Sequence, residues 1–186
     1  MSLKHGILGL LNYGSMTGYE LDKVFKDSLS FFWQAQTSQI YRELAAMEGI
    51  NGWLTSERVI QDDKPNKRIY SLTNAGREEL KKWLSTPEAD IREAMTVRSA
   101  FLMRVFFAGE TSDGQVLSML HAFRQKCAES ALALNAVPET IVKYGAEVDS
   151  TKRAKYWELA ALFGEIYYRA EMEWVEKAIA TVEGKE

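Results

Sequence analysis

The sequence has few residues that cross-link a chain or interrupt its secondary structure. Its 186 residues include a single cysteine, Cys127, with three prolines and twelve glycines. One thiol cannot form an internal disulfide, which favours a reducing compartment such as the cytoplasm. Neither end shows a charged-then-apolar leader or a long uncharged apolar run, so we expect a soluble chain without a membrane span. The scarcity of proline leaves room for long helices.

The sequence also lacks an excess of positive charge, since its formal net charge is -3. This balance argues against a protein that coats nucleic acid indiscriminately, because such coating requires the neutralisation of many phosphates. The first 85 residues carry 11 Lys and Arg against 10 Asp and Glu, and the remainder carries 12 against 16. With 46% hydrophobic and 26% charged residues, the chain is typical of a globular protein with two modest units.

Patterns of catalytic or metal-binding residues are missing as well. His5 and His121 are far apart in sequence, and Cys127 follows His121 by six positions, a spacing that does not place both on one helical face. The carboxylates show no pair that would act as general acid and base, and no glycine-rich phosphate loop is present. We therefore expect no metal, no cofactor and no enzymatic activity, and we expect Cys127 to be a small buried residue.

The first half of the sequence predicts three helices and a hairpin. Apolar residues recur at helical spacing up to Gly14, and a capping box over residues 17–20 predicts the start of a second helix. A third helix is predicted over residues 37–48. Its inward face is expected to carry Ile40, Leu44 and Met47. Two β-prone segments, 53–60 and 68–72, flank a polar stretch and predict a hairpin.

Beyond the hairpin, the sequence predicts helices only. Thr73 is expected to cap one helix, and further helices are predicted over residues 91–107, from Ser112 to Pro138, and from Thr151 to about Val182. The last helix would form a rod about 45 Å long, which requires a partner to cover it. The predicted fold class is mainly α. A winged helix-turn-helix domain with a two-stranded wing would occupy residues 1–86, followed by an all-helical dimerisation domain over residues 87–186.

The outward face of the predicted third helix favours DNA binding. It carries Ser38, Gln39 and Arg42 among small alanines that would let the helix approach a groove floor. Arg can donate two hydrogen bonds to guanine, and Gln can bond adenine in the same way. Any solvated helix shows a similar face, and any soluble hairpin shows a charged tip. It is their combination on a helix, helix, helix, hairpin frame that indicates a recognition helix with a basic wing.

Several motifs, in order over about half the chain, resemble the PadR family of bacterial transcriptional regulators. They are Ile7-Leu8-Gly9-Leu10-Leu11, Met16-Thr17-Gly18-Tyr19-Glu20-Leu21, Ile40-Tyr41-Arg42-Glu43-Leu44 with Glu48-Gly49-Ile50, and Tyr70-Ser71-Leu72-Thr73-Asn74-Ala75-Gly76 followed by Trp83-Leu84. The second half, with Arg98, Phe101, Leu102, Arg104 and Phe106, looks like the helical C-terminal domain of the subgroup that includes virulence activators. The resemblance implies a homodimer on an inverted repeat, and in some members a small aromatic or hydrophobic effector.

Three sets of residues follow from the residue chemistry and this resemblance. The expected contacts to double-stranded DNA are Tyr19, Lys23, Thr37, Ser38, Gln39, Tyr41, Arg42, Lys64, Asn66, Lys67 and Arg68. The expected dimer interface includes Leu3, Leu10, Phe101, Trp157, Tyr168 and Trp174. The candidate effector contacts are Phe32, Trp33 and Trp157. Aromatic residues of the last helix are more typical of an interface or a core than of a ligand pocket.

The leading interpretation is a cytoplasmic, homodimeric bacterial repressor that is tuned through its C-terminal helices. The alternative is a winged-helix module that binds another protein and has no effector. An enzyme is the third class, for which the sequence offers no catalytic constellation.

Overall fold

The computed structural model describes residues 3–30, 32–60, 66–94, 99–134 and 151–185. The chain divides into an N-terminal unit that reaches Ile91 and a C-terminal unit that begins at Arg92. None of the helices in the described ranges combines the length and apolar character that a membrane span needs.

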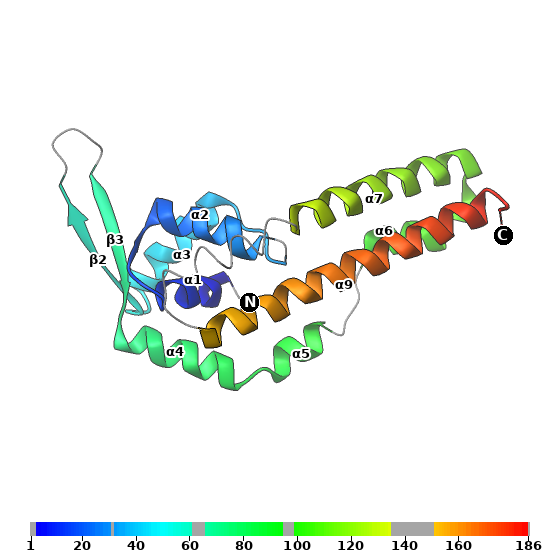
Figure 1. Ribbon diagram of the computed structural model, residues 1–186. Helices are drawn as coiled ribbons and strands as arrows, with labels where there is room; N and C mark the ends of the chain where they lie inside the picture. The colour runs from blue at the N-terminus through cyan, green and yellow to red at the C-terminus, as the bar shows by residue number, and fades with distance from the viewer. Residues whose placement is uncertain (1–2, 31, 61–65, 95–98, 135–150, 186) are drawn as a thin grey trace. The chain divides into compact units, whose positions relative to one another are not determined.

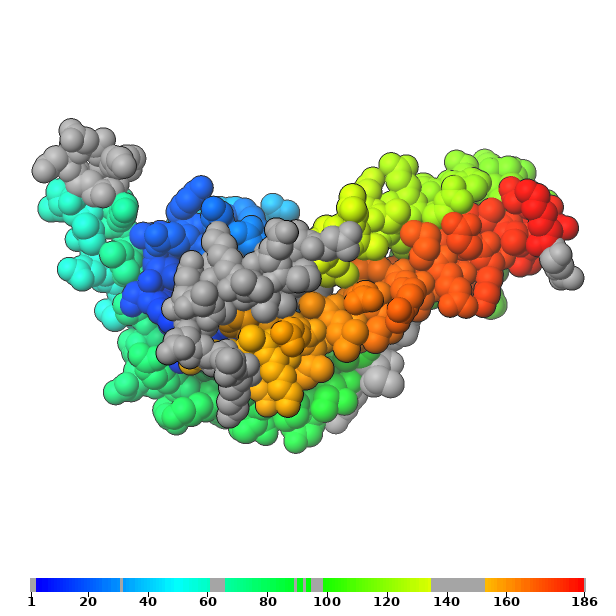
Figure 2. Space-filling view, viewed as in Figure 1, coloured from blue at the N-terminus to red at the C-terminus, as the bar shows by residue number. Residues whose placement is uncertain are grey.

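The N-terminal unit packs helices against one face of an antiparallel sheet (Figure 1). Its helices are α1 (Leu3–Leu11), α2 (Gly18–Leu29), α3 (Thr37–Gly49) and α4 (Asn74–Ser85), with α5 (Glu88–Ala94) following. The strands β1 (Met16–Thr17), β2 (Leu54–Val59) and β3 (Lys67–Leu72) lie in the order β1-β3-β2. In the space-filling view, β2 and β3 form a narrow projection beside the helices of this unit (Figure 2). The winged-helix fold is thereby confirmed.

The short strand β1 is an element that the sequence did not predict. It pairs with β3 through Met16 opposite Tyr70 and Thr17 opposite Ile69. Two residues are too few to show an alternating pattern, so this pairing depends on the hairpin already being in place. The strand matters because it holds the start of α2 against β3.

The predicted capping residues start their helices as expected. The Thr17 hydroxyl oxygen accepts the Glu20 N–H at 3.2 Å, and the Glu20 carboxylate accepts the Thr17 N–H at 2.8 Å. At α4, the Thr73 hydroxyl oxygen accepts the Gly76 N–H at 3.1 Å and donates to the Gly52 carbonyl at 2.8 Å. Each cap satisfies a backbone donor that the first turn leaves without a partner.

The core of the N-terminal unit contains the predicted inward face of α3. Ile40, Leu44 and Met47 are fully buried, together with apolar side chains of α1, α2, α4 and the sheet. Leu10, predicted for the dimer interface, belongs to this core with 6% of its surface exposed, so its side chain is used within the chain. Leu3, predicted for the same interface, is partly buried against the same core.

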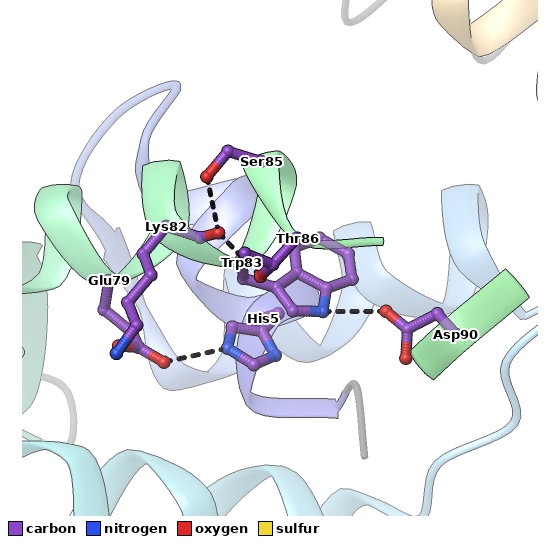
Figure 3. A network of polar contacts seen from close by, with 7 residues as sticks. All are labelled: His5, Glu79, Lys82, Trp83, Ser85, Thr86 and Asp90. Atoms are coloured by element: carbon purple, nitrogen blue, oxygen red, sulfur yellow. Dashed lines mark hydrogen bonds and ion pairs between the residues drawn. The ribbon is translucent and has the colours of Figure 1, made fainter. Parts of the chain in front are cut away.

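A polar and aromatic contact joins α1 to α4 and α5 (Figure 3). The His5 ring stacks on Trp83 with centroids 4.7 Å apart, and its Nε2 lies 3.2 Å from Oε1 of Glu79. The indole N–H of Trp83 donates to Oδ2 of Asp90 at 3.0 Å. His5 is only 7% exposed, and burial lowers the pKa of its imidazole below the ordinary value.

The regular secondary structure of the C-terminal unit is helical over its described residues. It contains α6 (Ala100–Phe106), a 3₁₀ turn (Ala108–Glu110), α7 (Asp113–Leu134) and the long α9 (Thr151–Val182), and α7 and α9 lie side by side (Figure 1). The predicted long last helix is confirmed. A small core is formed by Val116, Leu120, Val175 and Ile179.

The prediction of one continuous helix over residues 91–107 is wrong. Helix α5 ends at Ala94, and Ser99 adopts an extended backbone with φ -118° and ψ 111°. The Ser99 hydroxyl oxygen then accepts the Leu102 N–H at 3.1 Å and so caps α6. A serine side chain competes for backbone partners in this way, and the apolar periodicity alone did not reveal the break.

Candidate nucleic-acid interface

The outward face of α3 is as polar and open as the sequence predicts. Ser38 and Arg42 are exposed on the side opposite the buried core residues of the helix, and Thr37 is exposed at its first position. Ser38 and Arg42 are four residues apart and therefore lie one turn from each other along the same face. Ala45 continues this face one turn further and is exposed as well.

Two residues of the predicted contact set have partners within the chain. The side-chain oxygen of Gln39 accepts the Gln36 N–H at 2.8 Å, so one of its two lone pairs is used within the chain. The Thr37 hydroxyl oxygen accepts a bond from the Lys26 ammonium at 2.7 Å, which links α3 to α2. Ser38 and Arg42 are both exposed, and their role in direct base reading stays a prediction.

A hollow of about 420 Å³ lies beside this face, between the start of α2, helix α3 and strand β3. It is lined by Thr17, Gly18, Tyr19, Glu20, Tyr41, Asn66, Lys67, Arg68 and Tyr70. Tyr19, Tyr41 and Lys67 come from three different elements, and each was predicted separately to contact DNA. The hollow brings a lysine cation and two tyrosine hydroxyls to one place, and such groups donate to phosphate oxygens.

Gly18 determines how closely Tyr41 approaches α2. A Cβ atom at Gly18 would lie 2.7 Å from Cε1 of the Tyr41 ring, closer than atoms can pack. A glycine at this position therefore lets the ring rest on the first turn of α2. The sequence analysis placed Gly18 in a capping pattern and in a family motif, and the signal of this close approach was a glycine at the first position of a helix.

The charge within the hollow is mixed. The Glu20 carboxylate accepts hydrogen bonds from the Thr17 N–H and hydroxyl, and these bonds lower the pKa of Glu20, with a smaller contribution from Lys67. Both Thr17 bonds hold this carboxylate at the helix cap. Lys67 is exposed and lines the same hollow, so a cation lies there as well as this carboxylate.

The other predicted DNA contacts lie at several positions around the site. Lys23 is exposed on α2, and Asn66 lines the hollow. Arg68 also lines the hollow but forms an ion pair with Glu48 of α3 at 2.7 Å. Lys64 falls outside the described residues, so its role stays a prediction.

The residues predicted for an effector lie on both units. Trp33 is half-buried against the N-terminal core, and the neighbouring Phe32 is 52% exposed. Trp157 is half-buried on α9 of the C-terminal unit. Their role as effector contacts stays a prediction.

Two residues of the predicted dimer interface pack inside the C-terminal unit. Phe101 stacks on Phe123 with centroids 4.2 Å apart, and Trp174 meets both rings edge-on at 6.0 and 5.8 Å. Tyr168 is half-buried on α9, and its ring lies edge-on to that of Tyr167 at 5.4 Å.

Helix α9 instead exposes an apolar stripe that sequence reasoning missed. The stripe consists of Tyr156, Leu159, Phe163 and Ile166, which are 57%, 52%, 67% and 47% exposed. Their spacing of three, four and three residues places them on one seam, as in the a and d positions of a coiled coil. This spacing is present in the sequence and could have identified them.

Comparison with known proteins matches both halves of the chain. Residues 7–82 match the transcriptional regulator PadR-like family, and residues 97–183 match the virulence activator alpha C-terminal family. The negative transcriptional regulator PadR of Bacillus subtilis is 40% identical over 105 residues, which are 56% of this chain and 56% of that protein. The chain spans about half the length of the curated relatives it matches.

Solved structures extend the similarity over nearly the whole chain. A crystal structure of Bacillus subtilis PadR in complex with operator DNA covers 98% of this chain and 99% of its own, with a TM-score of 0.76 and 27% identity. A crystal structure of the same protein in complex with p-coumaric acid covers 97% and 95%, with a TM-score of 0.69 and 25% identity. The fold and the ordered family matches agree: residues 7–82 are similar to PadR-like transcriptional regulators, and the fold is similar to that of Bacillus subtilis PadR over nearly the whole chain.

Proposed function

We propose that this chain is a sequence-specific DNA-binding repressor that acts in the bacterial cytoplasm. The observation that carries the proposal is the hollow of Tyr19, Tyr41 and Lys67 beside the exposed face of α3. A helix in the major groove and a phosphate held next to it are the two contacts that a winged helix requires. The operator complex of Bacillus subtilis PadR and the description of that relative as a negative regulator support the same function.

Arg42 and Lys67 have different roles in this proposal. Arg42 is exposed at the centre of α3 and would read a guanine in the major groove through its two parallel N–H groups. Lys67 would neutralise a backbone phosphate, which carries no sequence information. Loss of Arg42 should therefore reduce specificity, and loss of Lys67 should reduce affinity for any DNA.

These roles can be separated by titrating the upstream region of the chain's own gene and a random duplex at several salt concentrations. Arg42→Ala should cost about 1–3 kcal/mol on the specific site and little on random DNA. Lys67→Ala should weaken both and reduce the salt slope by about 0.9. Lys81→Ala, on the exposed side of α4 and outside the hollow, serves as the matched control.

Equal losses for Arg42→Ala and Lys67→Ala on both duplexes would contradict the assigned roles. Failure of the unmodified chain to bind either duplex at low salt would contradict the function itself. Capture of a protein partner by α3 and the wing would then favour the protein-interaction module.

We also propose that the chain acts as a homodimer on an inverted repeat. The apolar stripe of α9 supports this, because Tyr156, Leu159, Phe163 and Ile166 form a coiled-coil type seam that is exposed in the single chain. A second copy would bury the same stripe against its own, as two-fold interfaces do. Two copies would then present two α3 helices to successive turns of the DNA.

Light scattering at micromolar concentration tests the dimer. The unmodified chain should have the mass of two copies, and Phe163→Glu should have the mass of one, because a carboxylate would be buried in the seam. Ile60→Glu, which introduces the same charge at a residue 78% exposed in the N-terminal unit, should leave the dimer intact. A monomeric unmodified chain, or a dimeric Phe163→Glu, would contradict this proposal.

A small aromatic or hydrophobic effector is the third part of the proposal. It is supported by the p-coumaric acid complex of Bacillus subtilis PadR and by the aromatic residues Phe32, Trp33 and Trp157 of this chain. Titration with p-coumaric acid should release the bound duplex and quench tryptophan fluorescence. Trp33→Leu should raise the concentration needed for release. Unchanged DNA binding at millimolar p-coumaric acid would contradict regulation by this class of ligand.

A further inference from the structure

Arg68 lies within a closed polar cluster that joins the recognition helix to both strands of the wing. Its guanidinium donates to Oε2 of Glu48 at 2.7 Å, and its Nε–H donates to the Ser56 hydroxyl oxygen at 2.6 Å. The Ser56 hydroxyl donates in turn to Oε1 of Glu48 at 2.6 Å. Glu48 belongs to α3, Ser56 to β2 and Arg68 to β3. We call these three residues the wing clamp.

Each residue of the wing clamp makes two hydrogen bonds within it. Both carboxylate oxygens of Glu48 accept a bond, and the Ser56 hydroxyl donates one bond and accepts another. All three bonds involve a charged group: both partners are charged in the Arg68–Glu48 bond, and one partner is charged in each of the other two. Such bonds are about twice as strong as neutral ones. The guanidinium also lies 5.6 Å from the ring centroid of Tyr70, a core residue only 6% exposed.

The sheet register gives an independent reason for this arrangement. Arg68 stands directly opposite Arg58 across the β2–β3 pair. Like charges at opposed positions destabilise a strand pair. The Glu48 carboxylate supplies the negative charge that offsets this repulsion. It comes from the last turn of α3, so that helix contributes to the stability of the strand pair.

We propose that Arg68 is a positioning residue, which sets the wing against α3 through Glu48 and Ser56, and does not neutralise a DNA phosphate. Lys67, its neighbour in β3, then lies at the hollow because the clamp holds the strand there. The charge of Arg68 is balanced by Glu48, so its loss should release no additional counterion from DNA. This inference rests on the proposed DNA-binding function.

Glu48→Gln gives opposite results under the two roles of Arg68. If Arg68 is a phosphate contact, removing a negative charge beside it should tighten binding to DNA. If Arg68 positions the wing, the same change should weaken binding, by about tenfold for the loss of a charge-assisted bond. Weaker binding is the expected result, and tighter binding would overturn the inference.

The salt dependence of DNA binding by Arg68→Gln and by Lys67→Gln provides the matched comparison. The two residues are adjacent in β3, and each variant loses one positive charge. Lys67→Gln should reduce the slope of log K against log salt by about 0.9, and Arg68→Gln should leave it unchanged while weakening binding about tenfold. Arg68→Lys keeps the charge but cannot bond two partners with a planar fork, so it should bind as weakly as Arg68→Gln. Equal slope changes for Lys67→Gln and Arg68→Gln, or full binding by Arg68→Lys, would refute the positioning role.

A double-mutant cycle without DNA separates the clamp from the proposed function. In urea unfolding, Glu48→Gln with Arg68→Gln should destabilise the chain by less than the two single changes added together, because either one breaks the same bond. Additive losses would overturn the clamp even if DNA binding is observed. Coupling between the two residues in a chain that binds no DNA would instead overturn the proposed function.

Discussion

Gly76 is the position where a single added methyl group should have the clearest structural effect. It lies in the first turn of α4, against the chain that leads into β2. A Cβ atom there would lie 2.3 Å from the carbonyl oxygen of Trp53 and 3.1 Å from Cδ1 of Leu72. The Trp53 carbonyl already accepts the Thr73 N–H at 3.0 Å, so moving it away would break that bond.

The magnitude follows from two opposing contributions. Overpacking in a tightly packed region costs about 1–3 kcal/mol, and loss of the Thr73 bond adds about 1 kcal/mol. The higher helix propensity of alanine offsets about 1 kcal/mol of this loss in the free energy of unfolding. The obstructing atom is backbone and not the end of a flexible side chain, so Gly76→Ala should lower the free energy of unfolding by about 1–3 kcal/mol.

Urea unfolding followed by circular dichroism measures this loss, with Gly9→Ala as the matched control. Gly9 lies in α1 of the same unit, and a Cβ atom there would meet no described atom within 4 Å. In Gly9→Ala, the higher helix propensity of alanine should therefore raise the free energy of unfolding by about 0.5–1 kcal/mol. Changes of the same sign in both variants, or a Gly76→Ala chain as stable as the unmodified one, would refute the reasoning.

Three further predictions concern single ionisable or capping groups. Burial lowers the pKa of His5 (Figure 3), so the unfolded chain binds more protons as pH falls through 6.5, and the free energy of unfolding should decline from there downward. His5→Asn should flatten this decline in urea unfolding, and the same change at the exposed His121 should not. Thr17→Ala should cost about 1 kcal/mol at neutral pH by removing the α2 cap. The pKa of Glu20 is lowered first by the Thr17 N–H bond, which alanine keeps, and second by the Thr17 hydroxyl bond, which it removes. The loss of the hydroxyl bond should make the difference narrow as pH falls below 4.5, measured by the same unfolding experiment. Burial and the nearby Glu171 raise the pKa of the Cys127 thiol to about 11. A thiol reagent at pH 8 should therefore label Cys127 at least about 100-fold more slowly in the native chain than in the urea-unfolded chain. Equal labelling rates would show that the native chain has an accessible thiolate.

Local sequence features were sufficient to predict the recognition helix and the wing strands. The inward face of α3 follows from the spacing of Ile40, Leu44 and Met47, because a helix repeats every 3.6 residues in any context. The starts of α2 and α4 follow from Thr17 and Thr73, whose hydroxyls bond backbone groups only three residues away. The break at Ser99 was missed because the apolar residues on both sides kept a helical spacing.

The roles of individual polar and aromatic side chains were decided by tertiary structure. The sequence predicts Arg68 as a positively charged DNA contact of the wing. In the structure its guanidinium is bonded to Glu48, which lies 20 residues away on another element. Phe101 and Trp174 read as interface residues, and packing between α6, α7 and α9 turns them inward. A periodic pattern determines which face of an element is apolar. Only the packing of elements distant in sequence determines which groups meet, and so which cations, such as Arg68, are paired with a carboxylate of another element.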